Sequence, residues 1–146
     1  MGDLIELTET ECRELLSAGL VARVAVCTPV GPHLVPVNYA VDDDSLVIRT
    51  TPYSVLGSNA RGATLALEVD QFDYDLQRGW SVMVRGRAEP VTSADELHHI
   101  QQTWDPNVWA SGQRNLFLRL RWSEISGRRI GGGWNPVDHL PVRRVV

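Results

Sequence analysis

The sequence lacks any apolar run long enough to cross a membrane, and its first ten residues, "MGDLIELTET", lack the basic and apolar regions of a secretory signal. It also lacks a basic excess, because the formal net charge is −4 at pH 7. We therefore expect a cytoplasmic protein that has neither a membrane nor a nucleic acid as partner. A chain of 146 residues has the size of one ordinary domain, so we expect a single domain over residues 1–146.

Cysteine is scarce, and no pattern typical of a metal site is present. The two cysteines, Cys12 and Cys27, lack the second pair that a zinc site needs. Free cysteines in a helix or an apolar strand usually behave as small buried hydrophobes, which is what we expect of both. His98 and His99 are adjacent, so on a helix they face different directions. We predict no metal.

The motifs of the common nucleotide-binding and hydrolytic enzymes are missing as well. No Gly-x-Gly-x-x-Gly follows a predicted strand, and neither a P-loop nor a Gly-x-Ser-x-Gly elbow occurs. Their absence disfavours a Rossmann enzyme, a P-loop NTPase and an α/β-hydrolase. Two carboxylate pairs occur, Glu68 with Asp70 and Asp73 with Asp75, but this spacing is common on solvated faces. We assign no catalytic residue.

The sequence does contain short apolar stretches separated by turn residues. Two capping boxes, Thr8 with Glu11 and Ser93 with Glu96, predict helices over about residues 8–18 and 93–103. Strands are predicted at 20–28, 33–41, 46–50, 63–70, 79–91 and 115–130, with room for a short helix between 51 and 62. Gly86 indicates a bulge or the close approach of another backbone. Residues 104–114 read as a loop.

The order of these elements predicts the fold class. Six strands with short connections, and no strand-helix-strand alternation, favour an antiparallel sheet that closes into a small barrel. We therefore expect a mainly β, six-stranded antiparallel barrel with flanking short helices. Its core spans about residues 6–130, and the Gly- and Pro-rich segment 131–146 is predicted to be an irregular C-terminal tail.

Polar side chains collect at the end of the third predicted strand, in "SLVIRTTPYS", residues 45–54. Arg49 offers a planar fork of donors that suits phosphate, and Thr50, Thr51 and Ser54 add hydroxyls. Two interpretations stay open from these residues alone: the polar end of an ordinary strand, which we favour, and an anion site. The later stretch "GWSVMVRG", which begins with Gly79, by itself indicates core packing.

Three stretches taken together resemble a known family. "VPVNYAVDDDSLVIRTTPYS", "LALEVDQFD" and "GWSVMVRGRAEPV", in this order and spacing, are similar to the pyridoxamine 5′-phosphate oxidase-related family of FMN-binding split β-barrels. The similarity extends over about residues 6–130 and is closer to the small actinobacterial members. It implies a split-barrel homodimer with two flavin sites at the subunit interface, each lined by both chains.

The resemblance implies cofactor contacts from four places in the chain. These are the strand beside the isoalloxazine ring, the strand end and turn at the ribityl phosphate, the strand that closes over the flavin, and the last strand. The matching residues are Pro36, Val37 and Asn38; Arg49, Thr50, Thr51, Ser54 and Val55; Trp80, Ser81 and Val82; and Arg128.

One position departs from the family's pattern. Relatives commonly carry a Gly-Ser-Lys turn whose lysine contacts the phosphate, whereas this chain has Tyr53, Ser54 and Val55. Losing one charge-assisted hydrogen bond costs about 1.5–3 kcal/mol, roughly tenfold to over a hundredfold in affinity. We therefore expect FMN to bind weakly or to dissociate during purification. The deazaflavin F420 and heme, which related proteins use, stay open as alternative cofactors.

The first functional hypothesis is an FMN-dependent oxidoreductase acting on an unidentified small organic acceptor or donor, in which the flavin does the chemistry. The alternatives are a non-catalytic protein that binds or carries a flavin, F420 or heme, and a structural dimer whose site has decayed. The pyridoxamine phosphate oxidase reaction itself is less expected. Arg128, Arg129, Arg143 and Arg144 only partly resemble the arginine- and histidine-rich motif that holds the substrate phosphate in those oxidases.

Overall fold

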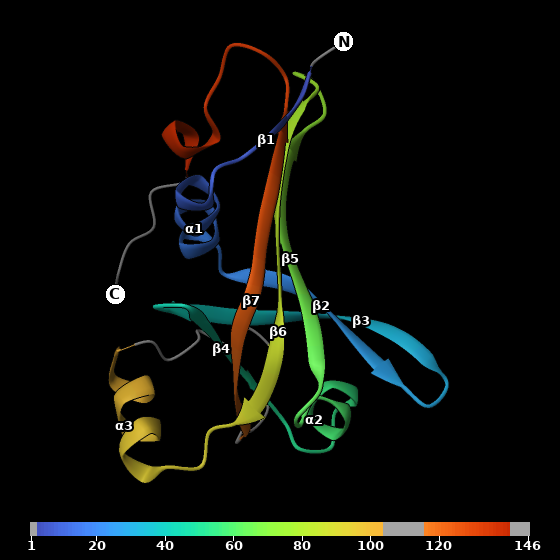
Figure 1. Cartoon of the computed structure of the whole chain (residues 1–146), viewed down its shortest axis with the longest axis vertical. Coiled ribbons are helices and arrows are strands. Elements are labelled where there is room, and N and C mark those ends of the chain that lie inside the picture. Colours follow the sequence, from blue (N-terminus) through green and yellow to red (C-terminus); the bar gives the residue numbers. More distant parts are fainter. Residues whose placement is uncertain (1–2, 104–115, 141–146) are drawn as a thin grey trace.

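The computed structural model describes residues 3–103 and 116–140. Its elements in chain order are β1 (Leu4–Glu6), α1 (Glu9–Ala18), β2 (Val21–Thr28), β3 (Gly31–Asp42), β4 (Ser45–Thr50), α2 (Val55–Asn59), β5 (Thr64–Asp73), β6 (Arg78–Pro90), α3 (Ala94–Thr103), β7 (Leu116–Ile130) and the 3-10 turn η1 (Pro136–His139). The strands form one antiparallel sheet in the order β1-β7-β4-β3-β2-β5-β6. A further pairing of β7 with β6 closes six of them into a ring (Figure 1). The predicted six-stranded antiparallel barrel is confirmed, with β1 as a short strand that the sequence did not predict.

Strand β7 closes the barrel because it has a partner on each side. Residues from Leu116 to Arg121 pair with β4, and residues from Leu118 to Ile130 pair with β6. The last three residues also pair with β1. Figure 1 shows β7 running along the length of the molecule beside β5 and β6, while β2 and β3 cross them. This strand therefore connects both ends of the barrel.

A bulge bends the ladder between β6 and β7. Arg85 pairs with Glu124 but Gly86 pairs with Trp122, so Ser123 is the extra residue. A Cβ atom on Gly86 would lie 2.0 Å from the carbonyl oxygen of Arg121, closer than any side chain can come. The bulge or close backbone approach predicted at Gly86 is confirmed.

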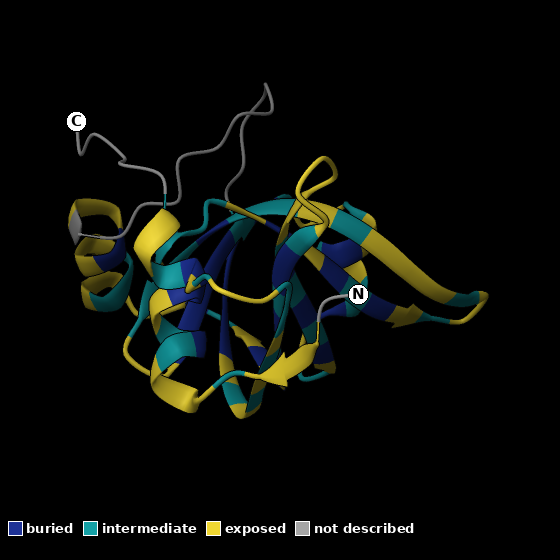
Figure 2. Ribbon diagram, turned by 90° about the horizontal axis from the view of Figure 1, so that it is seen from above, coloured by how far each residue is buried: buried dark blue, intermediate teal, exposed yellow. Residues whose placement is uncertain are grey.

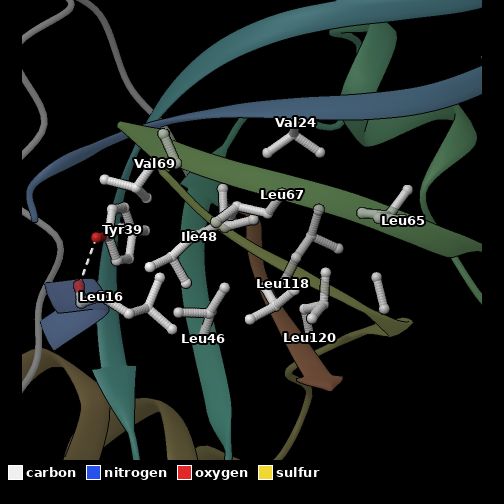
Figure 3. Packing of buried hydrophobic residues seen from close by; sticks show 14 of the residues in the cluster. Leu16, Val24, Tyr39, Leu46, Ile48, Leu65, Leu67, Val69, Leu118 and Leu120 are labelled. Atoms are coloured by element: carbon white, nitrogen blue, oxygen red, sulfur yellow. Dashed lines mark hydrogen bonds between the residues drawn. The ribbon is translucent and has the colours of Figure 1, made fainter. Parts of the chain in front are cut away.

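Alternation along the strands separates the barrel interior from its surface. Alternate residues on one face of β6 are all buried, and they are Trp80, Val82, Val84, Gly86 and Ala88. Leucines and isoleucines of β4, β5 and β7 meet them inside (Figure 3). Figure 2 shows the same division, with buried residues inside the ring and exposed residues on its outer side. Each fully buried aliphatic side chain contributes about 1.5–3 kcal/mol.

The helices begin where the capping residues predict. Thr8 Oγ1 accepts a hydrogen bond from Glu11 N, and the Glu11 carboxylate accepts one from Thr8 N, so the first capping box is complete. The Tyr39 hydroxyl, buried in the core, donates to the Leu16 carbonyl at 2.5 Å and ties α1 to β3 (Figure 3). None of the described helices is long and apolar enough to cross a membrane.

One burial prediction is wrong, and one predicted segment lies outside the described residues. Cys12 is buried as expected, but Cys27 is exposed. The reason is its position on β2, where Ala22, Val24 and Val26 point inward and the residues between them point outward. The loop predicted at 104–114 lies outside the described residues. In the described part of the tail, η1 is a single turn capped by the Asn135 side chain.

Arg119 is an arginine buried on β7, with 8% of its surface exposed. Its guanidinium donates to Asp42 at 2.8 Å, to Glu96 at 2.7 Å and to the Ser45 hydroxyl at 2.6 Å. The Glu96 carboxylate thus binds Arg119, while Glu96 N lies 3.4 Å from the Ser93 hydroxyl in the second predicted capping box. This network joins α3 to the turn between β3 and β4.

We expect Arg119→Ala to lower the free energy of unfolding by about 3 kcal/mol, because Asp42 and Glu96 would remain without their buried cation. Arg121→Ala is the matched control, since Arg121 lies two residues along the same strand and is exposed. The control should change stability by less than about 0.5 kcal/mol. Urea denaturation measures both variants, and equal losses would contradict a structural role for the Arg119 network.

Candidate functional site

The junction of β4 with α2 holds the residues predicted to meet a phosphate. Ser54 caps α2, and its Oγ accepts a hydrogen bond from Gly57 N at 2.9 Å. The same Oγ lies 3.0 Å from Thr50 Oγ1 and 2.9 Å from the Thr51 carbonyl oxygen. Because a hydroxyl carries one proton, the Ser54 side chain is already engaged in shaping this turn. The short helix predicted between residues 51 and 62 is confirmed.

Close packing fixes the shape of this junction. A Cβ atom on Gly57 would lie 2.0 Å from the Thr51 carbonyl oxygen, so α2 rests directly against the end of β4. The Arg49 guanidinium lies over the Phe117 ring, 5.2 Å from its centre. Val55, at the place of the family's lysine, is 42% exposed and therefore points to solvent. The junction thus offers a stacked guanidinium and hydroxyl groups, with an apolar side chain at the position where the resemblance implies a lysine.

A second group of predicted residues lies on the outer face of the barrel. Ser81 pairs with Asp70 on one side and with Arg128 on the other. Its neighbours Trp80 and Val82 point into the core, so Ser81 points outward. Arg128 is exposed. These residues place a hydroxyl and a guanidinium next to each other across the β6–β7 ladder.

The residues predicted on β3 divide between the two faces. Ala22, which is buried, pairs with Val37, so Val37 faces inward. Pro36 and Asn38 then face outward, and the Asn38 side-chain amide donates to the Leu20 carbonyl at 3.3 Å. Trp80 is only 6% exposed. The inward-facing residues can therefore offer a ligand little besides their backbone groups.

The structure separates the junction group from the Ser81 group within one chain. Arg49 pairs with Phe117 near the start of β7, and Ser81 pairs with Arg128 near its end. At about 3.3 Å per residue, these two points lie roughly 35 Å apart along the strand. That separation exceeds the length of an FMN molecule. One chain alone does not bring all the predicted site residues onto one mononucleotide.

Three charged residues of β2 and β5 cluster on the same outer face as Ser81. The Arg23 guanidinium lies 3.2 Å from the Glu68 carboxylate and 2.8 Å from that of Asp70. Burial, and then the neighbouring Asp70 carboxylate, raise the pKa of Glu68 to about 7. Arg23 acts in the opposite direction and keeps the pKa of Glu68 from rising further. A carboxyl group that titrates near neutral pH can accept and release a proton there.

Sequence spacing identified the Glu68 and Asp70 pair but missed Arg23. Arg23 meets the pair only because β2 and β5 are neighbours, with Arg23 opposite Glu68 in the ladder. The sequence carries no local signal of this long-range pairing. Among the described residues, no group of three histidine, cysteine, aspartate or glutamate side chains is arranged to hold a metal ion.

Comparison with known families identifies the fold. The family model described as "Pyridoxamine 5'-phosphate oxidase" matches residues 8–129. The chain belongs to this family. A curated relative, "Uncharacterized protein Rv0080" of Mycobacterium tuberculosis (strain ATCC 25618 / H37Rv), is 27% identical over 133 residues, which cover 88% of this chain and 86% of the relative. The resemblance stated from the three sequence stretches is confirmed.

Solved structures similar to this chain include proteins named as flavin-binding. The "FAD binding protein from Mycobacterium smegmatis" is 28% identical, with a TM-score of 0.72, covering 86% of this chain and 97% of that one. The "FAD and Heme binding protein" of the same organism is 20% identical, with a TM-score of 0.68, covering 89% of this chain and 75% of that one. The first comparison associates this fold with flavin binding, and the second, at its lower identity, shows the fold alone.

The raised pKa of Glu68 predicts a pH-dependent stability. Between the ordinary value of 4.5 and about 7, the folded state holds a proton on Glu68 that the unfolded state has lost. Stability should therefore fall as pH rises through this window. Because Glu68 is partly solvent-screened, we expect Glu68→Gln to be more stable than the parent by only about 1 kcal/mol at pH 8. The two proteins should be equally stable at pH 4.

Urea denaturation at pH 4 and pH 8 measures this difference. Glu89→Gln is the control, because Glu89 is an exposed glutamate that also pairs with an arginine, Arg87. It should show no gain at pH 8. A Glu68→Gln variant that is less stable than the parent at pH 8 would contradict the raised pKa.

Proposed function

We propose that the protein binds a flavin nucleotide between two copies of the chain and uses it as an oxidoreductase on a small organic molecule. The observation that carries the proposal is the Arg49 strand end packed against α2, in a family whose solved structures include an FAD-binding protein. The residues fit the cofactor in two parts, a phosphate end and a ring end.

The phosphate end is the β4–α2 junction. The Arg49 guanidinium, stacked on Phe117, would present its planar fork to the phosphate, and the Thr51 hydroxyl would add a hydrogen bond. Thr50 and Ser54 would act mainly by holding the turn, because their hydroxyls already bond to each other. With Val55 in place of a lysine, we expect FMN to bind more weakly than in relatives that have the cation.

The ring end is the outer face of the barrel. Pro36 and Asn38 of one copy would lie beside the isoalloxazine ring, with the backbone of Val37 between them. The Ser81 hydroxyl and the Arg128 guanidinium of the second copy would bind its polar edge. This arrangement accounts for the separation of roughly 35 Å along β7, since each copy supplies only one of the two groups. The two sites would be equivalent, as symmetry requires of a homodimer.

Exposed apolar side chains support a second copy on this face. Leu34 and Val21 are 73% and 38% exposed, and they lie on the outward side of β3 and β2. Pro36 lies between them, on the strand pair opposite Arg23. The outer face of an antiparallel sheet is usually polar when water covers it. A partner subunit would remove these side chains from water.

A bound flavin supplies hydride or electron transfer, which no side chain of this protein can perform. The chain's own residues would bind and orient it, and the exposed apolar side chains of Val21 and Leu34 would exclude water. Glu68, whose pKa lies at about 7, is two residues from the Asp70 that pairs with Ser81, and it can exchange a proton with solvent near the ring. A carrier of flavin, F420 or heme is the alternative, and the absence of flavin reduction by any donor would favour it.

We expect purified protein to change the absorption spectrum of added FMN or FAD and to melt at a higher temperature with it. Arg49→Ala should weaken FMN binding at least tenfold, because it removes a charge-assisted contact to the phosphate. Arg61→Ala is the matched control, an exposed arginine just beyond α2. Calorimetry measures both. If neither flavin binds, or if Arg49→Ala binds FMN like the parent, the phosphate role is refuted.

Mixed dimers test whether each site needs two chains. Each of the two variants damages both sites of a homodimer. Arg49→Ala damages the phosphate end of each site, and Arg128→Ala damages the ring end. In an equal random mixture, half of the dimers are mixed, and each has one intact and one doubly damaged site. Co-expression of the two variants with different tags should therefore restore tight FMN binding to about a quarter of all sites. A site built within one chain predicts no restoration.

A further inference from the structure

A cavity of about 550 Å³ lies between the hairpin that joins β5 to β6 and the segment around η1. Both segments lie at the same end of the barrel, at the top of Figure 1. Ligand sites for small molecules commonly have volumes of about 300–1,000 Å³. Of the residues assigned to the flavin, only Trp80 lines this cavity. The cavity is thus a separate space that the flavin proposal leaves unexplained.

Aromatic rings form much of the cavity wall. Tyr74 comes from the hairpin, Trp80 from β6, and Trp134 from the segment after β7. The Trp134 ring is held in place, because its Nε1 donates to the Ile130 carbonyl at 3.1 Å. His139 also packs edge-on against it, with ring centres 5.6 Å apart. Tyr74 is 90% exposed, although a tyrosine usually buries much of its ring. The wall therefore combines the fixed ring of Trp134 with the exposed ring of Tyr74, which is free to pack on a ligand.

Arg78 supplies a cation whose donors are not taken by acidic groups. Its guanidinium carbon lies 4.7 Å from the centre of the Trp134 ring. Arg78 stands opposite Asp73 in the β5–β6 ladder, yet it forms no ion pair with a carboxylate of residues 3–103 or 116–140. The Asp73 carboxylate instead accepts a hydrogen bond from Leu76 N at 3.0 Å, within the hairpin turn. Stacking orients the fork of Arg78 and leaves its N–H groups for an anion.

We propose that this cavity binds an adenine mononucleotide, with the base against the aromatic wall and the phosphate on Arg78. Nucleobases stack on aromatic side chains, and a stacked guanidinium suits the planar arrangement of phosphate oxygens. Asp75, which lines the cavity and is exposed, accepts hydrogen bonds and so favours a base with an exocyclic amine. Of the bases that have one, adenine is the base of the FAD that a similar solved protein binds. The nucleotide is either the adenylate half of FAD or a free molecule.

Calorimetric titration with AMP, adenosine and inorganic phosphate tests the site. AMP should bind, and adenosine and phosphate should each bind at least tenfold more weakly, since each supplies half of the contacts. Arg78→Gln and Trp134→Ala should each weaken AMP binding at least tenfold. Arg85→Gln is the control, because Arg85 is an exposed arginine of the same strand that pairs with Glu124 at 2.6 Å. It should bind AMP as the parent does.

Two results would overturn the proposal: no heat of binding with AMP at millimolar concentration, or AMP binding that Arg78→Gln leaves unchanged. Melting curves show whether each variant is folded. If Trp134→Ala does not fold, Arg78→Gln decides alone, because Arg78 is half-buried at the start of β6 and glutamine keeps most of its side chain.

A comparison of FAD with FMN distinguishes the two sources of the nucleotide. If the adenylate half of FAD occupies the cavity, FAD binds at least tenfold more tightly than FMN, and Arg78→Gln removes that difference without weakening FMN. If the ligand is a free nucleotide, FMN-loaded protein still binds AMP with unchanged affinity. AMP binding without any flavin binding would support this site and refute the proposed function. Flavin binding without AMP binding, and with equal affinity for FAD and FMN, would support the proposed function and refute the nucleotide site.

Discussion

The two-sided pairing of β7 is the constraint on which the rest of the structure depends. One edge of the strand continues the ladder of β4, and the other edge closes the ring on β6. The glycine at position 86 makes this closure possible, because its backbone lies against Arg121 at a distance that excludes a side chain. Closure in turn buries Arg119 where it can hold α3. The network of Arg119 with Asp42, Ser45 and Glu96 thus depends on the pairing of β7 with both of its neighbours.

The alternation of side chains determines where a ligand can be recognised. In β6 the same three residues give two side chains to the core, Trp80 and Val82, and one, Ser81, to the surface. The barrel interior is filled with side chains, so it has no room for a cofactor. A cofactor would therefore contact the outer face around Ser81 and the end of β4, and these two places lie far apart in one chain. A shared site between two copies is the simplest way to use both.

Local patterns predicted most of the fold but little of the site's electrostatics. Capping at Thr8 and the bulge at Gly86 depend on neighbouring residues and backbone space, so they can be read from the sequence. The exposure of Cys27 could not, because it depends on which residues of β2 face the core. The meeting of Arg23 with Glu68 requires the pairing of β2 with β5. The cavity beside Trp134 likewise requires the tail to return to a hairpin some sixty residues earlier.

Val55 stands where the resemblance implies a lysine, and the composition of the whole chain changes how this departure is interpreted. The chain contains no lysine at all, so every basic side chain is an arginine. A valine at one turn is therefore weak evidence that this particular site has decayed. Arg49 and Arg78 are each stacked on an aromatic ring, Phe117 and Trp134. Stacking fixes the plane of a guanidinium, whereas a lysine ammonium is a point charge on a flexible stem. A fixed guanidinium loses less freedom when it binds an anion, which partly offsets the absence of a lysine at position 55. The two proposed anion sites, at the β4–α2 junction and at the hairpin cavity, would thus share one arrangement, an arginine stacked on an aromatic ring.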